Sequence, residues 1–122
     1  MPTPHPHELG RAGEEMAASW YVERGYEILA RNWRCPAGEA DLVLRRGRLL
    51  VVCEVKTRSG TGYGTPAEAV GRQRQRRLRR TAAMFLEAER ERAEGFRGRG
   101  IRFDVAEVLG GVVTVIEDAF RD

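Results

Sequence analysis

Residues 40–55, ADLVLRRGRLLVVCEV, decide the fold of this 122-residue chain. They contain two runs of strand-forming residues, 40–44 and 49–55, on either side of residues 45–48, which include Gly47. Two such runs separated by a short segment with a glycine are typical of a β-hairpin. We therefore expect a hairpin at the centre of the chain.

An amphipathic helix is predicted ahead of the hairpin, over residues 9–24, because apolar side chains recur there at helical spacing. Residues 1–8 are expected to form a loose lead-in, and Gly25 is expected to end the helix. A first strand is predicted over residues 26–33. The chain thus enters the hairpin from a helix followed by a strand.

After the hairpin we expect a loop over residues 58–65, where three glycines occur. A second helix is predicted from Thr65, which precedes a proline and a capping glutamate, to about residue 92. Strands over residues 101–109 and 112–116 follow, joined by a tight turn at Gly110-Gly111.

This order of elements predicts an α/β or α+β fold, with the hairpin central in a sheet that two main helices flank. The length fits a single domain over residues 1–122. No apolar run reaches the ~18–20 residues of a membrane-spanning helix, and the first residues lack the layout of a secretory signal. We therefore expect a cytoplasmic protein with no membrane partner, in which Cys35 and Cys53 are free thiols.

Lys56 is the only lysine among 21 basic residues, and all the others are arginines. A chain with this bias is expected to keep a lysine mainly where arginine does not serve as well. Lysine offers a compact, rotatable ammonium that can lie close to a water molecule or a phosphate oxygen. Lys56 is therefore a candidate catalytic residue.

Three acidic residues of the hairpin are expected to converge near this lysine. Alternate residues of a strand face the same side, so Glu54 and the lysine two positions later project together. If the hairpin closes over residues 46–47, Asp41 pairs with Val52 and Glu39 pairs with Glu54. Asp41 is then the diagonal neighbour of Glu54. A slip of one residue would separate the carboxylates, so the prediction depends on the turn.

Carboxylates gathered on an apolar sheet repel each other, and a bound cation is the usual compensation. Oxygen ligands without nearby His or Cys favour Mg²⁺ or Mn²⁺ over zinc. Asp41 and Glu54 are therefore the candidate metal ligands, and Lys56 could orient a water or stabilise charge on a phosphate. The alternative is an ordinary solvent-facing alternation of Glu and Lys, which is the better interpretation of an isolated Glu-x-Lys.

Four segments carry a family resemblance: GEADLV at residues 38–43, VCEVKTR at 52–58, Tyr63-Gly64, and RFDV at 102–105. They resemble the bacterial YraN family, small proteins regarded as candidate endonucleases, and the resemblance extends over nearly the whole chain. It implies a more distant similarity to archaeal Holliday-junction resolvases and the PD-(D/E)xK nuclease superfamily. The fold implied is a restriction-endonuclease-like mixed sheet, and resolvase-like relatives imply a homodimer.

By this resemblance Asp41 is the motif aspartate, Glu54 the second metal ligand and Lys56 the catalytic lysine, with Mg²⁺ or Mn²⁺ as cofactor. The resemblance also implies an acid on the first helix. Glu14 lies beside the apolar stripe of the predicted helix, whereas Glu15 lies on the solvent side, so we expect Glu14 to join the site. The alternative is an acid that only interacts favourably with the helix dipole.

The chain departs from the family early in the second helix, where Lys-Gln is expected and Arg74-Gln75 occurs. Arginine can still contact phosphate, but a direct catalytic role is then less expected. Gln75 lies on the inward stripe of the helix. It either completes the site, as Glu39 would at its margin, or is a hydrogen-bonded core glutamine.

Arginines crowd the start of the second helix, mostly on the face away from its apolar stripe. They are Arg72, Arg74, Arg76, Arg77, Arg79 and Arg80. With an acidic metal site nearby, such a face indicates a phosphate-binding surface. The expected nucleic-acid contacts are Arg58, Arg72, Arg74, Arg76 and Arg77. The alternative is a solvated helix face in an arginine-rich protein.

The leading hypothesis is a metal-dependent endonuclease that hydrolyses phosphodiester bonds in DNA, including structured or branched DNA. A second is a nucleic-acid-binding module that keeps the nuclease scaffold without cutting. A third is an interaction protein whose acidic cluster is incidental. The sequence does not distinguish DNA from RNA.

Overall fold

The computed structural model describes residues 6–58 and 70–120, and within them it contains two helices and five strands. In chain order these are α1 (Pro6–Glu23), β1 (Glu27–Cys35), β2 (Gly38–Arg46), β3 (Leu49–Arg58), α2 (Arg72–Arg90), β4 (Ile101–Leu109) and β5 (Val112–Ile116). The predicted order of elements is confirmed. The strands predicted over residues 101–109 and 112–116 have these bounds, whereas β1, β2 and β3 continue beyond the predicted ends.

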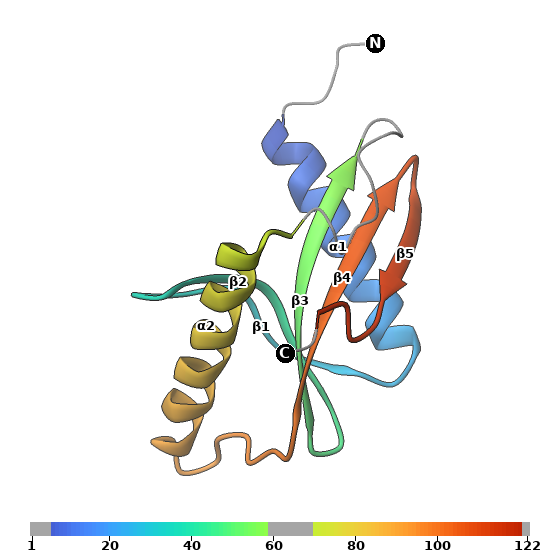
Figure 1. Ribbon diagram of the computed structural model, residues 1–122. Coiled ribbons are helices and arrows are strands. Elements are labelled where there is room, and N and C mark those ends of the chain that lie inside the picture. The colour runs from blue at the N-terminus through green and yellow to red at the C-terminus, as the bar shows by residue number, and fades with distance from the viewer. Residues whose placement is uncertain (1–5, 59–69, 121–122) are drawn as a thin grey trace.

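The five strands form one sheet in the order β1-β2-β3-β4-β5. The β3–β4 pair is parallel and the other three pairs are antiparallel. The β2–β3 hairpin therefore lies inside a mixed sheet, and α2 belongs to the crossover between the two parallel strands. Figure 1 shows α1 on one face of the sheet and α2 on the other. This α/β architecture is consistent with a restriction-endonuclease-like fold.

Two separate apolar cores fill the two sides of the sheet. On the α2 side, Val43 and Val52 pack with Phe85, and on the α1 side, Leu42 and Val51 pack with other buried side chains. Strands that are buried on both faces are nearly continuously apolar, which explains the run Leu49–Cys53 in β3. The alternation also fixes the side to which the later residues of β3 project.

A buried polar network fastens α1 to the sheet. The Tyr21 hydroxyl donates a hydrogen bond of 2.7 Å to Oδ2 of Asp104, which is fully buried in β4. The Arg102 guanidinium donates to both oxygens of this carboxylate at 2.9 Å, and the Asp118 amide donates to Oδ1 at 3.0 Å. A buried carboxylate is tolerated when it is paired and hydrogen-bonded in this way.

The predicted register of the hairpin is wrong by two residues. The turn consists of Gly47 and Arg48, so Arg46 pairs with Leu49 and Val43, not Asp41, pairs with Val52. Gly47 adopts a φ of 61°, and placing glycine at the first turn position avoids a positive φ at an arginine. A shift of two residues keeps every side chain on its predicted face.

Helix α1 begins at Pro6, three residues before the predicted start, so part of the expected lead-in is helical. Proline is favoured at the first helical position, because its missing N–H is one that a helix leaves unpaired there. Pro6 itself is therefore the sequence signal for this start. The helix ends at Glu23, followed by Gly25 with a φ of 88°, as expected for a glycine stop.

Helix α2 begins at Arg72 after an extended Gly71, and residues 70–71 are not helical. The predicted start at Thr65 and the loop residues after Arg58 lie outside the described residues. Val70 is buried in the core on the α2 side, which holds the chain extended just before the helix. The helix ends at Arg90, two residues before the predicted end.

Candidate metal and phosphate site

A cleft of about 710 Å³ opens where the hairpin strands separate, and three acidic residues line it. Glu14 comes from α1, Asp41 from β2 and Glu54 from β3, and Arg58 lies at the same cleft. These acids are distant in the sequence, so the fold brings them to one place. Lys56 and Glu39, which were also expected near these acids, are not among the residues that line the cleft.

Asp41 occupies the gap between β2 and β3. The ladder ends where Leu42 pairs with Cys53, and the backbone N–H of Val55 then donates to Oδ2 of Asp41 at 2.8 Å. Burial, followed by repulsion from Glu54, raises the pKa of Asp41 to about 7, although the hydrogen bond from Val55 opposes this shift. A neighbouring cation would stabilise the ionised form of such a carboxylate.

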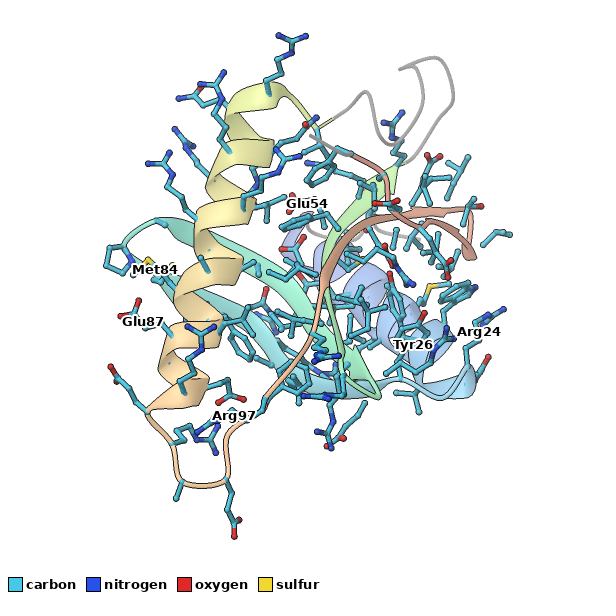
Figure 2. All side chains as sticks on the ribbon, turned by 60° about the horizontal axis from the view of Figure 1, so that its bottom comes forward. Arg24, Tyr26, Glu54, Met84, Glu87 and Arg97 are labelled. Atoms are coloured by element: carbon cyan, nitrogen blue, oxygen red, sulfur yellow. The ribbon has the colours of Figure 1, made fainter. Side chains whose placement is uncertain are left out.

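Glu54 is a buried carboxylate that faces two cations. Its side chain is 6% exposed. Oε1 lies 3.5 Å from Nζ of Lys56, and Oε2 lies 2.9 Å from Nη2 of Arg74. The contact with Arg74 places Glu54 on the α2 side of the sheet, and Figure 2 shows it between α2 and β3. The shared face of Glu54 and Lys56 follows the alternation predicted for this strand.

Glu14 reaches the cleft because the residue before it, Gly13, packs closely on Thr57 of β3. A Cβ atom on Gly13 would overlap Oγ1 of Thr57, so this approach requires glycine. Nδ2 of Asn32 donates to Oε2 of Glu14 at 3.0 Å. Glu15 is exposed, as its place on the helical wheel predicted, and it pairs with Arg31.

Glu39 lies at the margin of the cluster, and Gln75 bonds to the chain just before α2. The Glu39 carboxylate lies 3.5 Å from Nε of Arg34, and the Glu39 carbonyl accepts a hydrogen bond of 3.3 Å from Arg74. The side-chain amide of Gln75 donates, through Nε2, to the carbonyl of Val70 at 2.7 Å. Gln75 thus resembles the hydrogen-bonded glutamine that was the alternative interpretation.

The arginines at the start of α2 divide into two groups. Arg72, Arg76 and Arg77 are exposed, whereas Arg74 turns inward to Glu54. Figure 2 shows nitrogen-tipped side chains projecting outward from this part of α2. The exposed group supplies a positive surface, and Arg74 belongs to the acidic cluster itself.

Two contacts at this site were not predicted from the sequence. Arg74 was expected to bind nucleic acid, and its ion pair with Glu54 was not anticipated. Asn32 supports Glu14 from a backbone with a φ of 47°. Asparagine is one of the few residues that tolerate this conformation, so an isolated asparagine within a strand was the available signal.

The donor set fits a hard divalent cation. Within residues 6–58 and 70–120, no three His, Cys, Asp or Glu side chains are grouped to hold a metal ion. Mg²⁺, however, is commonly bound through one or two carboxylates, with water and phosphate oxygens completing its coordination. Asp41 and Glu54 satisfy that requirement, and burial, followed by repulsion from Glu54, raises the pKa of Asp41, so its charge is one that a cation would stabilise.

Fold and site together define an α/β protein with a restriction-endonuclease-like sheet and a carboxylate–lysine cluster at the open end of its central hairpin. The chain belongs to the Uncharacterised protein family UPF0102, which is the YraN family, and the family model matches residues 13–108. In the described part of the chain, no helix is long and apolar enough to cross a membrane.

Relatives match over most of their length. The UPF0102 protein of Acidothermus cellulolyticus is 44% identical over 122 residues, covering 92% of each chain. The UPF0102 protein of Frankia casuarinae is 54% identical over 97 residues, covering 80% of this chain and 78% of the relative. That of Clavibacter michiganensis is 48% identical over 103 residues, covering 84% and 82%. The part of the chain that the family model matches includes Glu14, Asp41 and Glu54.

Proposed function

We propose that the protein is a metal-dependent endonuclease that hydrolyses phosphodiester bonds in DNA, including structured or branched DNA. One observation carries the proposal. Asp41, a carboxylate with a raised pKa, lies beside Glu54 at an open cleft, and Nζ of Lys56 lies 3.5 Å from Oε1 of Glu54. Two acids and a lysine at one point are the groups that metal-assisted attack on a phosphodiester requires.

Asp41 and Glu54 would hold Mg²⁺ or Mn²⁺ through their oxygens. The bound cation supplies a more acidic water and neutralises charge on the phosphate. The hydrogen bond from Val55 fixes Asp41, so this ligand is oriented before any cation arrives. Such preorganisation reduces the cost of binding.

Lys56 is suited to donate hydrogen bonds to a phosphate oxygen or to the attacking water. Its side chain is 35% exposed, so the ammonium can reach a substrate from its place beside Glu54. Glu14, held by Asn32, is placed to accept a hydrogen bond from a water in the cleft. These roles extend the assignment that the family resemblance implied.

The exposed arginines Arg72, Arg76 and Arg77, with Arg58 at the cleft, would bind the phosphate backbone. Contacts of this kind position a nucleic acid without reading its sequence. A homodimer would place two such sites on one substrate, and sedimentation at several protein concentrations measures whether it forms.

The test is a panel of structured DNA and RNA substrates incubated with Mn²⁺. We expect cleavage by the wild type and losses of at least ~100-fold in Glu54→Gln and Lys56→Met, because each removes a group from the reacting centre. Glu87→Gln is the matched control, since Glu87 is an exposed acid on α2 far from Glu54 (Figure 2). Its activity should equal that of the wild type.

Cleavage that survives in both site variants would contradict the proposal, as would equal activity in EDTA. Cleavage of RNA but not of DNA would support metal-dependent hydrolysis and would contradict DNA as the substrate. All variants are first compared by circular dichroism, so that a loss of fold is not mistaken for a loss of chemistry.

A second candidate function is a nucleic-acid-binding module that does not cut. The observation that favours it is the ion pair between Arg74 and Glu54, because an internal cation already compensates one of the two ligands. Salt-dependent binding that is unchanged by Mn²⁺ and by Lys56→Met, with no cleavage, would support this function over the first.

A further inference from the structure

Arg74 is held inside the cluster in which we propose that a divalent cation binds, so the inference that follows rests on the proposed function. Its Nη2 donates to Oε2 of Glu54 at 2.9 Å and to the Glu39 carbonyl at 3.3 Å. The Arg74 side chain is 33% exposed. One edge of the guanidinium is therefore bound, while part of the group still contacts solvent.

A cation and Arg74 would compete for the same carboxylate. Glu54 is almost completely buried, and its second oxygen already lies 3.5 Å from Lys56. A divalent ion on Glu54 would therefore meet a positive guanidinium at close range. Like charges at such distances in a poorly solvated site repel strongly. Binding of the ion thus favours movement of Arg74 away from Glu54.

We infer that Arg74 changes partner when a divalent cation binds, from Glu54 in the free protein to a phosphate of the nucleic acid in the loaded protein. The released guanidinium has several donors in a planar fork, which matches the oxygens of a phosphate. It lies on the first turn of α2, in the same segment as exposed Arg72 and Arg76. A small movement of the side chain adds it to the positive surface.

This exchange couples the two ligands. In the free protein Arg74 neutralises Glu54 and lowers the affinity for metal. Once the metal is bound, Arg74 becomes available and raises the affinity for nucleic acid. Linkage requires that nucleic acid raise the affinity for metal by the same factor.

The first test measures the binding of Mn²⁺ alone by isothermal titration calorimetry. Arg74→Ala and Arg74→Met remove the competing charge, and we expect both to bind Mn²⁺ roughly tenfold more tightly than the wild type. Arg74→Met keeps the aliphatic stem and therefore the packing. Arg80→Ala is the matched control, since it removes an equal charge from an exposed position on the same helix and should bind as the wild type does.

Unchanged or weaker Mn²⁺ binding in both Arg74 variants would overturn the inference and leave the proposed function intact. Binding by the variants but not by the wild type would support it. Absence of binding in every protein would overturn both the inference and the metal site on which it rests.

The second test measures how DNA affinity depends on salt, with and without Ca²⁺, which replaces Mg²⁺ in order to slow cleavage. A contact with one phosphate adds about one to the slope of log affinity against log salt. We expect Arg74→Met to lower the slope by about one only when Ca²⁺ is present. An equal loss with and without Ca²⁺ would show a permanent phosphate contact and overturn the exchange, as would no loss in either condition.

Discussion

Asp41 accepts, through Oδ2, a hydrogen bond of 2.8 Å from the backbone N–H of Val55, just beyond the last paired residues of the β2–β3 hairpin. The carboxylate thus takes the place that a backbone carbonyl of β2 would have if the ladder continued. This contact holds the Asp41 charge between the two strands and close to Glu54. The free protein must therefore carry an unfavourable charge, which a ligand can relieve.

Asp41→Asn is expected to stabilise the metal-free protein at pH 8. The pKa of Asp41 is raised to about 7 in the folded state, above its value in the unfolded chain. The stability that protonated Asp41 contributes is therefore lost as pH rises from about 4 through about 7. Asparagine keeps an acceptor for Val55 and carries no charge, so we expect a gain of roughly 1–3 kcal/mol at pH 8.

Urea denaturation in EDTA at pH 4.5 and pH 8 measures this difference. The gain should be smaller at the lower pH, where Asp41 is mostly protonated in the folded protein and therefore carries little charge there. Glu87→Gln provides the control for removal of an exposed acid and should change little at either pH. An equal gain in stability for Asp41→Asn at pH 4.5 and pH 8 would show that removal of the Asp41 charge does not cause the gain.

Cation binding should strengthen as pH rises through about 7. Below that pH the ion must displace a proton from Asp41, whereas above it the carboxylate is already ionised. Calorimetric titration with Mn²⁺ in two buffers of different ionisation enthalpy measures the protons released. We expect release approaching one proton near pH 6 and little near pH 8. Binding that is independent of pH over this range would exclude Asp41 as a ligand.

Gly13→Ala should weaken both the fold and the site, because the added methyl overlaps Oγ1 of Thr57. Overpacking of this kind costs about 1–3 kcal/mol, partly offset by the better helix propensity of alanine. The displaced helix would also move Glu14 away from the cleft. The double variant Gly13→Ala/Thr57→Ala removes the overlap, so thermal unfolding and cleavage should both recover. If the single variant melts as the wild type does, α1 is not held by this contact.

Arg97→Ala should lower stability without changing the chemistry of the cleft. The Arg97 guanidinium donates to the carbonyls of Glu89, Arg90 and Arg92 at 2.6, 2.9 and 3.1 Å, around the end of α2. Removing these bonds leaves terminal carbonyls of the helix to water, at a cost of about 1–2 kcal/mol. Denaturant unfolding measures the loss, and Mn²⁺ affinity should be unchanged. An altered Mn²⁺ affinity would show that the end of α2 is coupled to the site.

The sequence was sufficient to predict the order of elements and the faces of β3, because strand periodicity depends only on alternation. It was insufficient for the register of the hairpin. Two turns that differ in the place of Gly47 fit the same apolar pattern, and only backbone geometry distinguishes them. The error was an even number of residues, so the inference that Asp41 and Glu54 converge was unaffected.

The contact between Arg74 and Glu54 could not be predicted, because it depends on where α2 begins and how it is rotated. A run rich in arginine has no polar–apolar contrast that singles out an inward guanidinium such as that of Arg74. The importance of Gly13 could not be predicted either, since it depends on the position of Thr57. Side-chain contacts between elements that are distant in the sequence therefore could not be predicted from the sequence.

The connectivity of the sheet bears on the order in which the protein folds. Strands β1, β2 and β3 follow one another and pair with their neighbours, whereas β4 can pair with β3 only after the chain has crossed through α2. Short loops close at a lower entropic cost than long ones, so we expect the three-stranded meander to form first. The two hairpin acids and Lys56 then meet early, and Arg74 joins them when α2 docks. Substitutions in the Gly47 turn should therefore slow folding, whereas loss of Arg74 should mainly speed unfolding.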